Sequence, residues 1–167
     1  INQYPNNYEL NKFLGLVSAH SNNFDEALIF FNKCLEINDL SSDIYFNLGL
    51  IYKKKGLLDL SVKNYKEAIK FNSAFLDAYI NLGVVFEQQE KYNECLNILD
   101  SLIKKDKTNY KAYFNLGNIF KKLSRFEDSI NAYEKAIKIN NRQAEIFFNL
   151  ALVLKKIGNY DDAIVNY

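Results

Sequence analysis

The sequence has little of what metal sites, disulfide frameworks and membrane spans require. Its 167 residues include no methionine or tryptophan, one proline, one histidine and two cysteines. Cys34 and Cys95 are too few for a disulfide framework, and both recur at small-residue positions, so we interpret them as structural. The lone His20 falls on the exposed side of a predicted helix, and we interpret it as a surface residue. No apolar run approaches the roughly 20 residues that a membrane-spanning helix needs.

Motifs of catalysis are also missing. The sequence has no HExxH metal motif, no Gly-rich phosphate-binding loop and no GxGxxG dinucleotide fingerprint. The residue types that bind metals do not cluster along the chain. We therefore expect a protein that is not an enzyme, with no catalytic residues, no metal site and no cofactor.

The charges nearly cancel. Twenty-one Lys and Arg residues face twenty Asp and Glu residues, which leaves a net charge of +1. Nucleic-acid-binding proteins and proteins of anionic membrane surfaces carry a basic excess, so we expect neither partner. The chain begins at Ile1 and the repeats described below are cut at both ends, so we expect a fragment of a longer protein. Free cysteines are typical of a reducing compartment, and the expected location is cytoplasmic.

A period of 34 residues organises what is present. The tripeptide Asn-Leu-Gly occurs at 47–49, 81–83 and 115–117, and Asn-Leu-Ala follows at 149–151. Internal repeats of this length indicate stacked supersecondary units. Within one unit the apolar residues recur at helical spacing, as in 110–123 and again in 126–139. Turn-forming residues separate the two segments, so each unit is predicted to be a first helix (helix A), a tight turn and a second helix (helix B).

These units resemble the tetratricopeptide repeat family. Unit 42–75 carries the family's signature residues Tyr45, Leu48, Gly49, Tyr52, Ser61, Tyr65 and Ala68. The resemblance implies an all-α, right-handed solenoid of antiparallel helix pairs in a single array. The predicted divisions are a tail of a preceding repeat at 1–7, repeats 8–41, 42–75, 76–109 and 110–143, and a truncated repeat 144–167. Pro5 alone stands at the family's proline position. Leu99 and Leu102 depart from the family pattern, so we expect helix B of 76–109 to pack differently.

A glycine recurs inside each of the first four A helices. Gly inside a helix costs about 1 kcal/mol relative to Ala, so a compensating contact is expected. The glycines are Gly15, Gly49, Gly83 and Gly117. We expect each to face the small residue of helix B in its own unit (Ala27, Ser61, Cys95 or Ser129), so that the two backbones approach closely.

One side of helix A is predicted to remain outside the core of its unit. With Ser42 counted as position 1, a wheel of 100° per residue places positions 4, 7, 8 and 11 together and positions 2, 6, 9 and 13 opposite them. The family resemblance implies that the opposite side lines a concave groove. Position 6 is asparagine in four successive units, which we call the asparagine ladder. Its members are Asn47, Asn81, Asn115 and Asn149.

A side-chain amide offers donors and an acceptor that match one peptide unit. The asparagine ladder is therefore predicted to hold an extended peptide by its backbone. Similar ladders occur in the tetratricopeptide arm of O-linked N-acetylglucosamine (O-GlcNAc) transferases, where they hold peptide substrates. The alternative is a local role, for example a bond from Asn47 to Asp43 four residues earlier.

Two further sets of residues are candidates for the binding face. Position 5 carries residues that form either an apolar groove floor or contacts between neighbouring repeats: Phe46, Ile80, Phe114 and Phe148. At position 13, Lys54 and Lys122 either attract an acidic ligand or complement the helix dipole. The family's carboxylate clamp for chaperone C-termini is absent, because Leu16, Asp77 and Asn81 replace its Asn, Lys and Arg.

The sequence thus favours an interaction scaffold that binds an extended peptide or a partner protein along its A helices. One alternative is the substrate-recognition arm of a larger O-GlcNAc-transferase-like glycosyltransferase. Another is a homotypic assembly scaffold, because open ends of a repeat array expose apolar surface and favour end-to-end self-association.

Overall fold

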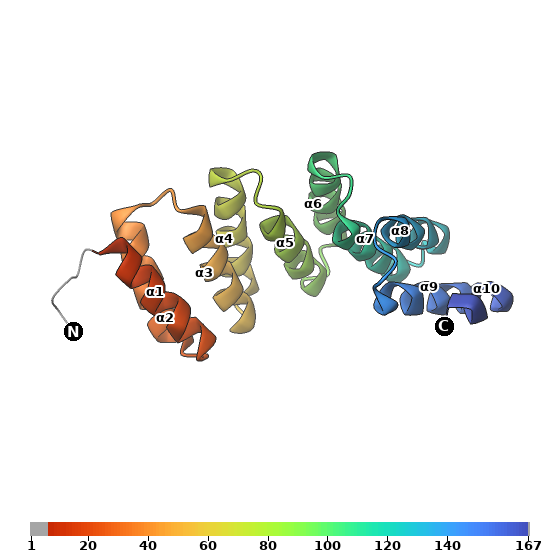
Figure 1. Cartoon of the computed structure of the whole chain (residues 1–167), viewed down its shortest axis with the longest axis horizontal. Coiled ribbons are helices and arrows are strands. Elements are labelled where there is room, and N and C mark those ends of the chain that lie inside the picture. The colour runs from red at the N-terminus through yellow and green to blue at the C-terminus, as the bar shows by residue number, and fades with distance from the viewer. Residues whose placement is uncertain (1–6, 167) are drawn as a thin grey trace. The chain divides into compact units, whose positions relative to one another are not determined.

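The computed structural model describes residues 7–166, and this part of the chain is all α-helical (Figure 1). The helices run in the order α1 Tyr8–His20, α2 Phe24–Ile37, α3 Ser42–Lys54, α4 Leu58–Phe71, α5 Leu76–Gln88, α6 Tyr92–Lys105, α7 Tyr110–Lys122, α8 Phe126–Ile139, α9 Ala144–Lys156 and α10 Tyr160–Asn166. The odd-numbered helices are A helices and the even-numbered ones are B helices. The predicted all-α fold of paired helices is confirmed. Pro5, Tyr167 and most of the predicted tail 1–7 lie outside the described residues.

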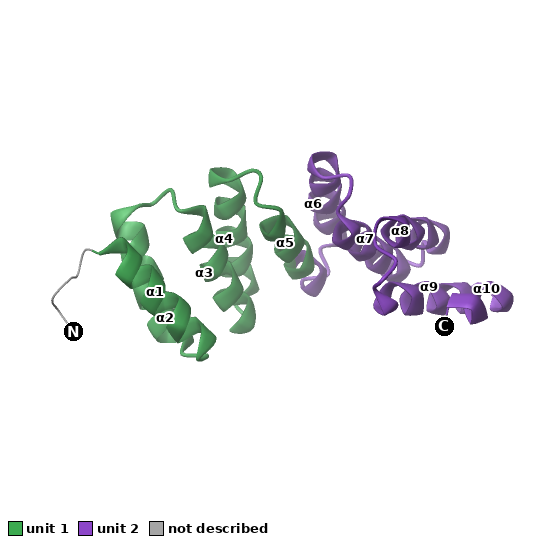
Figure 2. Ribbon diagram, viewed as in Figure 1, with its two compact units in different colours: residues 1–85 green, residues 86–167 purple. Residues whose placement is uncertain are grey.

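The chain divides into two compact units, residues 1–85 and 86–167, with the boundary inside α5 (Figure 2). In the first unit, α1 packs on α2, α3 packs on α4, and α2 contacts α3. In the second unit, α6 contacts α7, α7 packs on α8, and α9 packs on both α8 and α10. Each unit is described by itself below.

The turn between helix A and helix B has the same backbone conformation in every repeat. Its second residue has a positive φ of 61° at Asn22, 74° at Gly56, 57° at Glu90, 57° at Ser124 and 83° at Gly158. Left-handed backbone of this kind suits Gly, and Asn tolerates it. The 34-residue repeat therefore imposes one turn geometry even where Glu or Ser occupies the position.

Three of the recurring glycines, Gly15, Gly49 and Gly117, lie under aromatic rings, which differs from the contact that we expected. A Cβ atom on Gly15 would lie 2.7 Å from the ring of Phe31, and one on Gly49 would lie 2.6 Å from the ring of Tyr65. The small residue of helix B nevertheless bonds to the glycine in two repeats: the Ser61 hydroxyl donates to the Gly49 carbonyl at 2.8 Å, and Ser129 does the same to Gly117. The glycine thus makes room for a ring, which explains why larger residues are disfavoured there.

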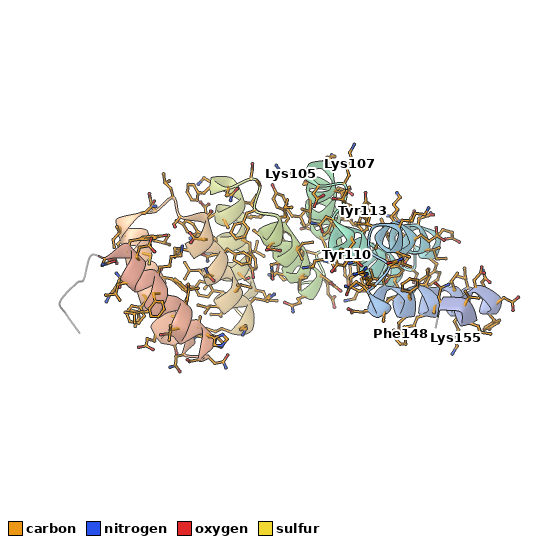
Figure 3. All side chains as sticks on the ribbon, viewed as in Figure 1. Lys105, Lys107, Tyr110, Tyr113, Phe148 and Lys155 are labelled. Atoms are coloured by element: carbon orange, nitrogen blue, oxygen red, sulfur yellow. The ribbon has the colours of Figure 1, made fainter. Side chains whose placement is uncertain are left out.

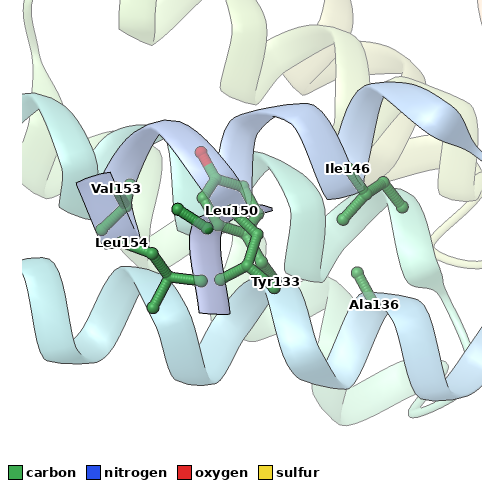
Figure 4. Packing of buried hydrophobic residues seen from close by; sticks show 7 residues of the cluster. Tyr133, Ala136, Ile146, Leu150, Val153 and Leu154 are labelled. Atoms are coloured by element: carbon green, nitrogen blue, oxygen red, sulfur yellow. The ribbon is translucent and has the colours of Figure 1, made fainter. Parts of the chain in front are cut away.

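The contact between successive repeats uses positions 3 and 10 of helix A. The helical wheel had placed the core at positions 4, 7, 8 and 11 and did not include these two. Ile44 and Ile51 of α3 are 0% and 2% exposed and join a cluster with Ala27, Phe31 and Cys34 of α2. The same pattern recurs in the second unit, where α9 residues lie over Tyr133 and Ala136 of α8 (Figure 4). Because burial of one such Ile contributes roughly 1.5–3 kcal/mol, this repeated contact is a main source of stability.

Candidate functional site

The four asparagines of the ladder occupy equivalent places on α3, α5, α7 and α9, and each is half-buried. In three of them the side-chain amide donates to the backbone carbonyl four residues earlier. Asn47 donates to Asp43 at 2.8 Å, Asn81 to Asp77 at 2.9 Å and Asn149 to Glu145 at 2.9 Å. The local bond that we weighed for Asn47 is therefore present, although its acceptor is the backbone oxygen of Asp43. It occupies one of the two amide hydrogens and holds the amide in one orientation.

Two of these asparagines are also bound by a lysine of the preceding repeat. The Lys53 ammonium donates to Oδ1 of Asn81 at 2.8 Å, within the first unit. In the second unit, the Lys121 ammonium donates to Oδ1 of Asn149. In both cases the lysine lies 28 residues before its asparagine, so the bond links helix A of one repeat to helix A of the next.

This lysine is present in only some repeats, which explains why the other two asparagines differ. Position 12 is Ala19 ahead of Asn47 and Glu87 ahead of Asn115, and neither side chain can donate to an amide oxygen. Within the described part of the chain, the Asn115 side chain makes no hydrogen bond and Asn47 makes only its local one. The ladder therefore contains two kinds of asparagine: those bound by lysine and those with an unoccupied amide oxygen.

The lysines at position 13, which we had placed among the binding residues, contact helix residues of the preceding repeat. The Lys54 ammonium lies 5.6 Å from the ring centroid of Phe24, and Lys156 lies 5.3 Å from that of Phe126. Lys122 instead pairs with Glu87 at 2.8 Å. Cation–π contacts and ion pairs of this kind fasten one repeat to its neighbour. Lys54 and Lys122 therefore already have partners inside the protein.

The position-5 residues differ in exposure. The Phe46 ring lies 4.6 Å from that of Phe75 and 5.7 Å from that of Tyr65, measured between centroids, and Phe114 lies 6.0 Å from Tyr133. Ile80 is half-buried. Phe148 is 50% exposed and projects from the same side of α9 as Lys155 (Figure 3). Phe46 and Phe114 thus pack on helix B of their own repeat while part of each ring remains accessible.

The electrostatics of this face differ along the chain. Lys12 and Asp43 form an ion pair across the first junction between repeats. Burial alone raises the pKa of Asp43, but hydrogen bonds from Lys12 and Ser41 outweigh it and hold that pKa below its usual range. Burial, followed by the nearby charge of Lys54, lowers the pKa of Lys53. Burial and Lys122 lower the pKa of Lys121, against opposing effects of Glu87 and Glu145.

Two cavities of the second unit lie between helix A and helix B, away from the ladder. One of about 270 Å³ is lined by Tyr113, Leu116, Phe120, Asp128, Asn131, Ala132 and Lys135. The other, of about 360 Å³, is lined by Glu134, Ile137, Lys138, Phe147, Leu150, Leu154, Asp162 and Asn166. Neither contains a ladder asparagine, and neither brings together a recognisable catalytic set. Across residues 7–166, no group of three or more His, Cys, Asp or Glu is arranged to hold a metal, and no helix is long and apolar enough to cross a membrane.

Comparison of the sequence with family profiles gives matches to three tetratricopeptide repeat profiles. One, described as a TPR repeat, matches residues 51–90 and 117–158. Two described as a tetratricopeptide repeat match residues 30–63 and 13–39. A search of curated protein sequences found no match.

Solved structures of the same fold are similar to this chain. MamA (41-end) from Desulfovibrio magneticus RS-1 superposes with a TM-score of 0.85 at 16% identity, covering 95% of this chain and 90% of that one. PilF of Pseudomonas aeruginosa gives 0.84 at 22% identity, covering 96% and 73%. YrrB, described as a TPR protein with an unusual peptide-binding site, gives 0.72 at 18% identity, covering 91% and 78%. At these identities the likeness establishes the fold.

Proposed function

Because this chain belongs to the tetratricopeptide repeat family, and because its A helices carry a regular series of amides, we propose that it binds an extended peptide segment of a partner protein along the asparagine ladder. Within the first unit Asn47 holds the backbone of the peptide and Asn81 adds its remaining N–H, and within the second unit Asn115 and Asn149 do the same. Exposed parts of Phe46, Ile80, Phe114 and Phe148 receive the peptide's apolar side chains.

The observation that carries this proposal is the state of the ladder amides. The i−4 backbone bond uses one donor of Asn47, which leaves its second N–H and its oxygen available. Asn115 has its whole amide available among the described residues. The half-buried Asn47 amide is already oriented by its local bond, so it loses little entropy when it binds and its hydrogen bonds to a ligand are favoured.

The test is a peptide-binding comparison with matched variants. An array of 12-residue peptides is first screened with the wild type, and the peptides retained are then titrated by fluorescence anisotropy. We expect the Asn47→Ala/Asn115→Ala variant to bind them roughly 5- to 150-fold more weakly, since each lost bond contributes about 0.5–1.5 kcal/mol. Ala favours helix more than Asn does, so the variant remains folded, which circular dichroism checks.

The control replaces two exposed asparagines of B helices, Asn32→Ala and Asn97→Ala. It has the same change in composition and does not touch the A helices. Equal weakening in ladder and control variants, or unchanged binding in both, would contradict the proposal.

Homotypic assembly is a second candidate, favoured by one observation. Leu10 and Val17 of α1 are 39% and 47% exposed, whereas Ile44 and Ile51, their equivalents on α3, are almost fully buried against the preceding repeat. A second copy that covers Leu10 and Val17 would reproduce this contact. The candidate predicts a molar mass that rises with concentration in light scattering and falls in Leu10→Lys/Val17→Lys; a constant monomer mass would rule it out.

The third possibility, a substrate-recognition arm of a glycosyltransferase-like enzyme, uses the same ladder. It differs from an autonomous scaffold by a catalytic domain on the same polypeptide. Sequencing the complete coding region decides between the two.

A further inference from the structure

We propose that the peptide ligand carries acidic side chains, and that Lys53 with Asn81 and Lys121 with Asn149 are two equivalent carboxylate-binding sites, one in each compact unit. This inference rests on the proposed function, because it assigns a ligand chemistry to the same face of the A helices.

The donor geometry of each pair suits a carboxylate. An ammonium group has three hydrogens, and in each pair the asparagine oxygen accepts one of them, at 2.8 Å in the Lys53–Asn81 pair. The asparagine amide has two hydrogens, and the backbone carbonyl of Asp77 or Glu145 accepts one of them. Two ammonium hydrogens and one amide hydrogen are thus left close together. A carboxylate accepts such bonds with both oxygens, and bonds to charged groups are the stronger ones.

Within residues 7–166, the charge of Lys53 and that of Lys121 lack an ionic partner. Among the described residues, neither Lys53 nor Lys121 forms an ion pair, and the one hydrogen-bond acceptor of each is a neutral amide. The adjacent lysines at position 13 do have partners, because Lys122 pairs with Glu87 and Lys54 lies over the ring of Phe24. Lys53 and Lys121 are also half-buried, where a charge is less screened by water than on the open surface. A half-buried cation held by an amide is stabilised when an anion arrives.

The two pairs are expected to differ in strength. Glu87 and Glu145 raise the pKa of Lys121 and oppose the effects of burial and Lys122, whereas burial and Lys54 both lower the pKa of Lys53. The first unit therefore presents the more strongly uncompensated cation. The repeats that lack a lysine at position 12 provide an internal contrast: Ala19 and Glu87 precede Asn47 and Asn115, and those asparagines have no cationic partner from position 12.

The experiment uses paired peptides in which every Glu of one member is Gln in the other. All peptides are amidated at the C-terminus, so that side chains are the only carboxylates, and a third set has Gln with a free C-terminal carboxylate. Pairs retained by the wild type are titrated by fluorescence anisotropy. We expect the Glu member to bind at least about tenfold more tightly than the Gln member, and the preference to fall severalfold in Lys53→Met and less in Lys121→Met.

The control variant is Lys63→Met/Lys138→Met, which removes two exposed lysines of B helices and changes the net charge by the same amount as the double variant Lys53→Met/Lys121→Met. A Glu preference that survives Lys53→Met/Lys121→Met, or that falls equally in the control, would overturn the site. Preference for the free C-terminus alone would overturn the side-chain assignment. Peptides that bind with no Glu preference would overturn this inference and leave the proposed function standing, whereas no peptide binding at all would overturn both.

Discussion

At the scale of single residues, two equivalent tyrosines show how one neighbour changes the cost of burial. Tyr65 and Tyr133 are both 0% exposed and both lie over the glycine of their own repeat. The Tyr133 hydroxyl donates to Asn118 at 2.7 Å, whereas the buried Tyr65 hydroxyl has no hydrogen-bond partner among residues 7–166. Asn118 stands at position 9, which in the repeat of Tyr65 is Leu50. The difference between the repeats therefore comes from position 9.

This difference predicts opposite effects of the same substitution. Tyr65→Phe removes an unsatisfied buried hydroxyl and is expected to raise the free energy of unfolding by about 1 kcal/mol. Tyr133→Phe removes a satisfied bond, leaves Asn118 without its donor and is expected to lower it by about 1 kcal/mol. Urea denaturation followed by circular dichroism measures both. If both substitutions change the free energy of unfolding by the same amount and in the same direction, the residue at position 9 does not determine the cost of burying the hydroxyl.

The candidate site shows at the same scale what the sequence does not reveal. Repetition indicates position 6, whereas the helical wheel favours Lys54 and Lys122 over Lys53 and Lys121. A wheel drawn on one helix places position 13 beside position 6 and position 12 about 120° away. The bonds from Lys53 to Asn81 and from Lys121 to Asn149 join two different helices. Their formation depends on how far one repeat is displaced from the next, and a recurring Lys–Asn separation of 28 residues was the one available signal.

At the scale of helices and turns, the sequence predicted most of the fold. The 34-residue period and the helical spacing of apolar residues predicted about five helix pairs, and the structure has ten helices over residues 7–166. The contacts within and between the helix pairs were less predictable. A glycine in a helix indicates close approach without naming the group that approaches, so the ring of Phe31 over Gly15 was missed. Ile44 and Ile51 were missed because their partners belong to another repeat.

The turn between the paired helices gives a prediction about backbone strain. Ser124 has a φ of 57° and Gly56 a φ of 74° at the same place in their repeats, and nothing lies within 4 Å of a Cβ at Gly56. Left-handed backbone costs a non-glycine residue about 1–2 kcal/mol, which exceeds the extra chain entropy that Gly loses on folding. We expect Ser124→Gly to raise the free energy of unfolding by roughly 0.5–1 kcal/mol and Gly56→Ser to lower it by as much. Thermal denaturation measures both variants. A melting temperature that is lower for Ser124→Gly than for Gly56→Ser would contradict this prediction.

At the scale of the whole molecule, each compact unit contains one buried thiol. Cys34 and Cys95 are 0% and 1% exposed. Burial raises the pKa of Cys34 from 9.0 to about 11 and that of Cys95 from 9.0 to about 12. A pKa that is higher in the folded state means that the unfolded state loses its proton first as the pH rises. The stabilising contribution is complete well below the unfolded pKa of 9.0, and it is lost as the pH rises through that value toward the folded values.

Stability is therefore expected to fall between pH 8.5 and about pH 10, by roughly 1.4 kcal/mol per thiol at the upper end. Urea midpoints measured across this interval test it. The variant Cys34→Ala/Cys95→Ala provides the control, because its stability is expected to depend less on pH in the same window. If the variant and the wild type lose the same amount, the thiols are not the cause.

The most direct test of the central claim, that the asparagines of the A helices bind a peptide backbone, is nuclear magnetic resonance of the side-chain amides. A ¹⁵N-labelled sample is titrated with a peptide selected from the array, and the NH₂ signals of the asparagines are followed. We expect the signals of Asn47, Asn81, Asn115 and Asn149 to shift in a saturable manner with the affinity measured by anisotropy. Those of Asn32 and Asn97 on the B helices should remain in place. Saturable shifts at Asn32 and Asn97 with none on the ladder would contradict the account.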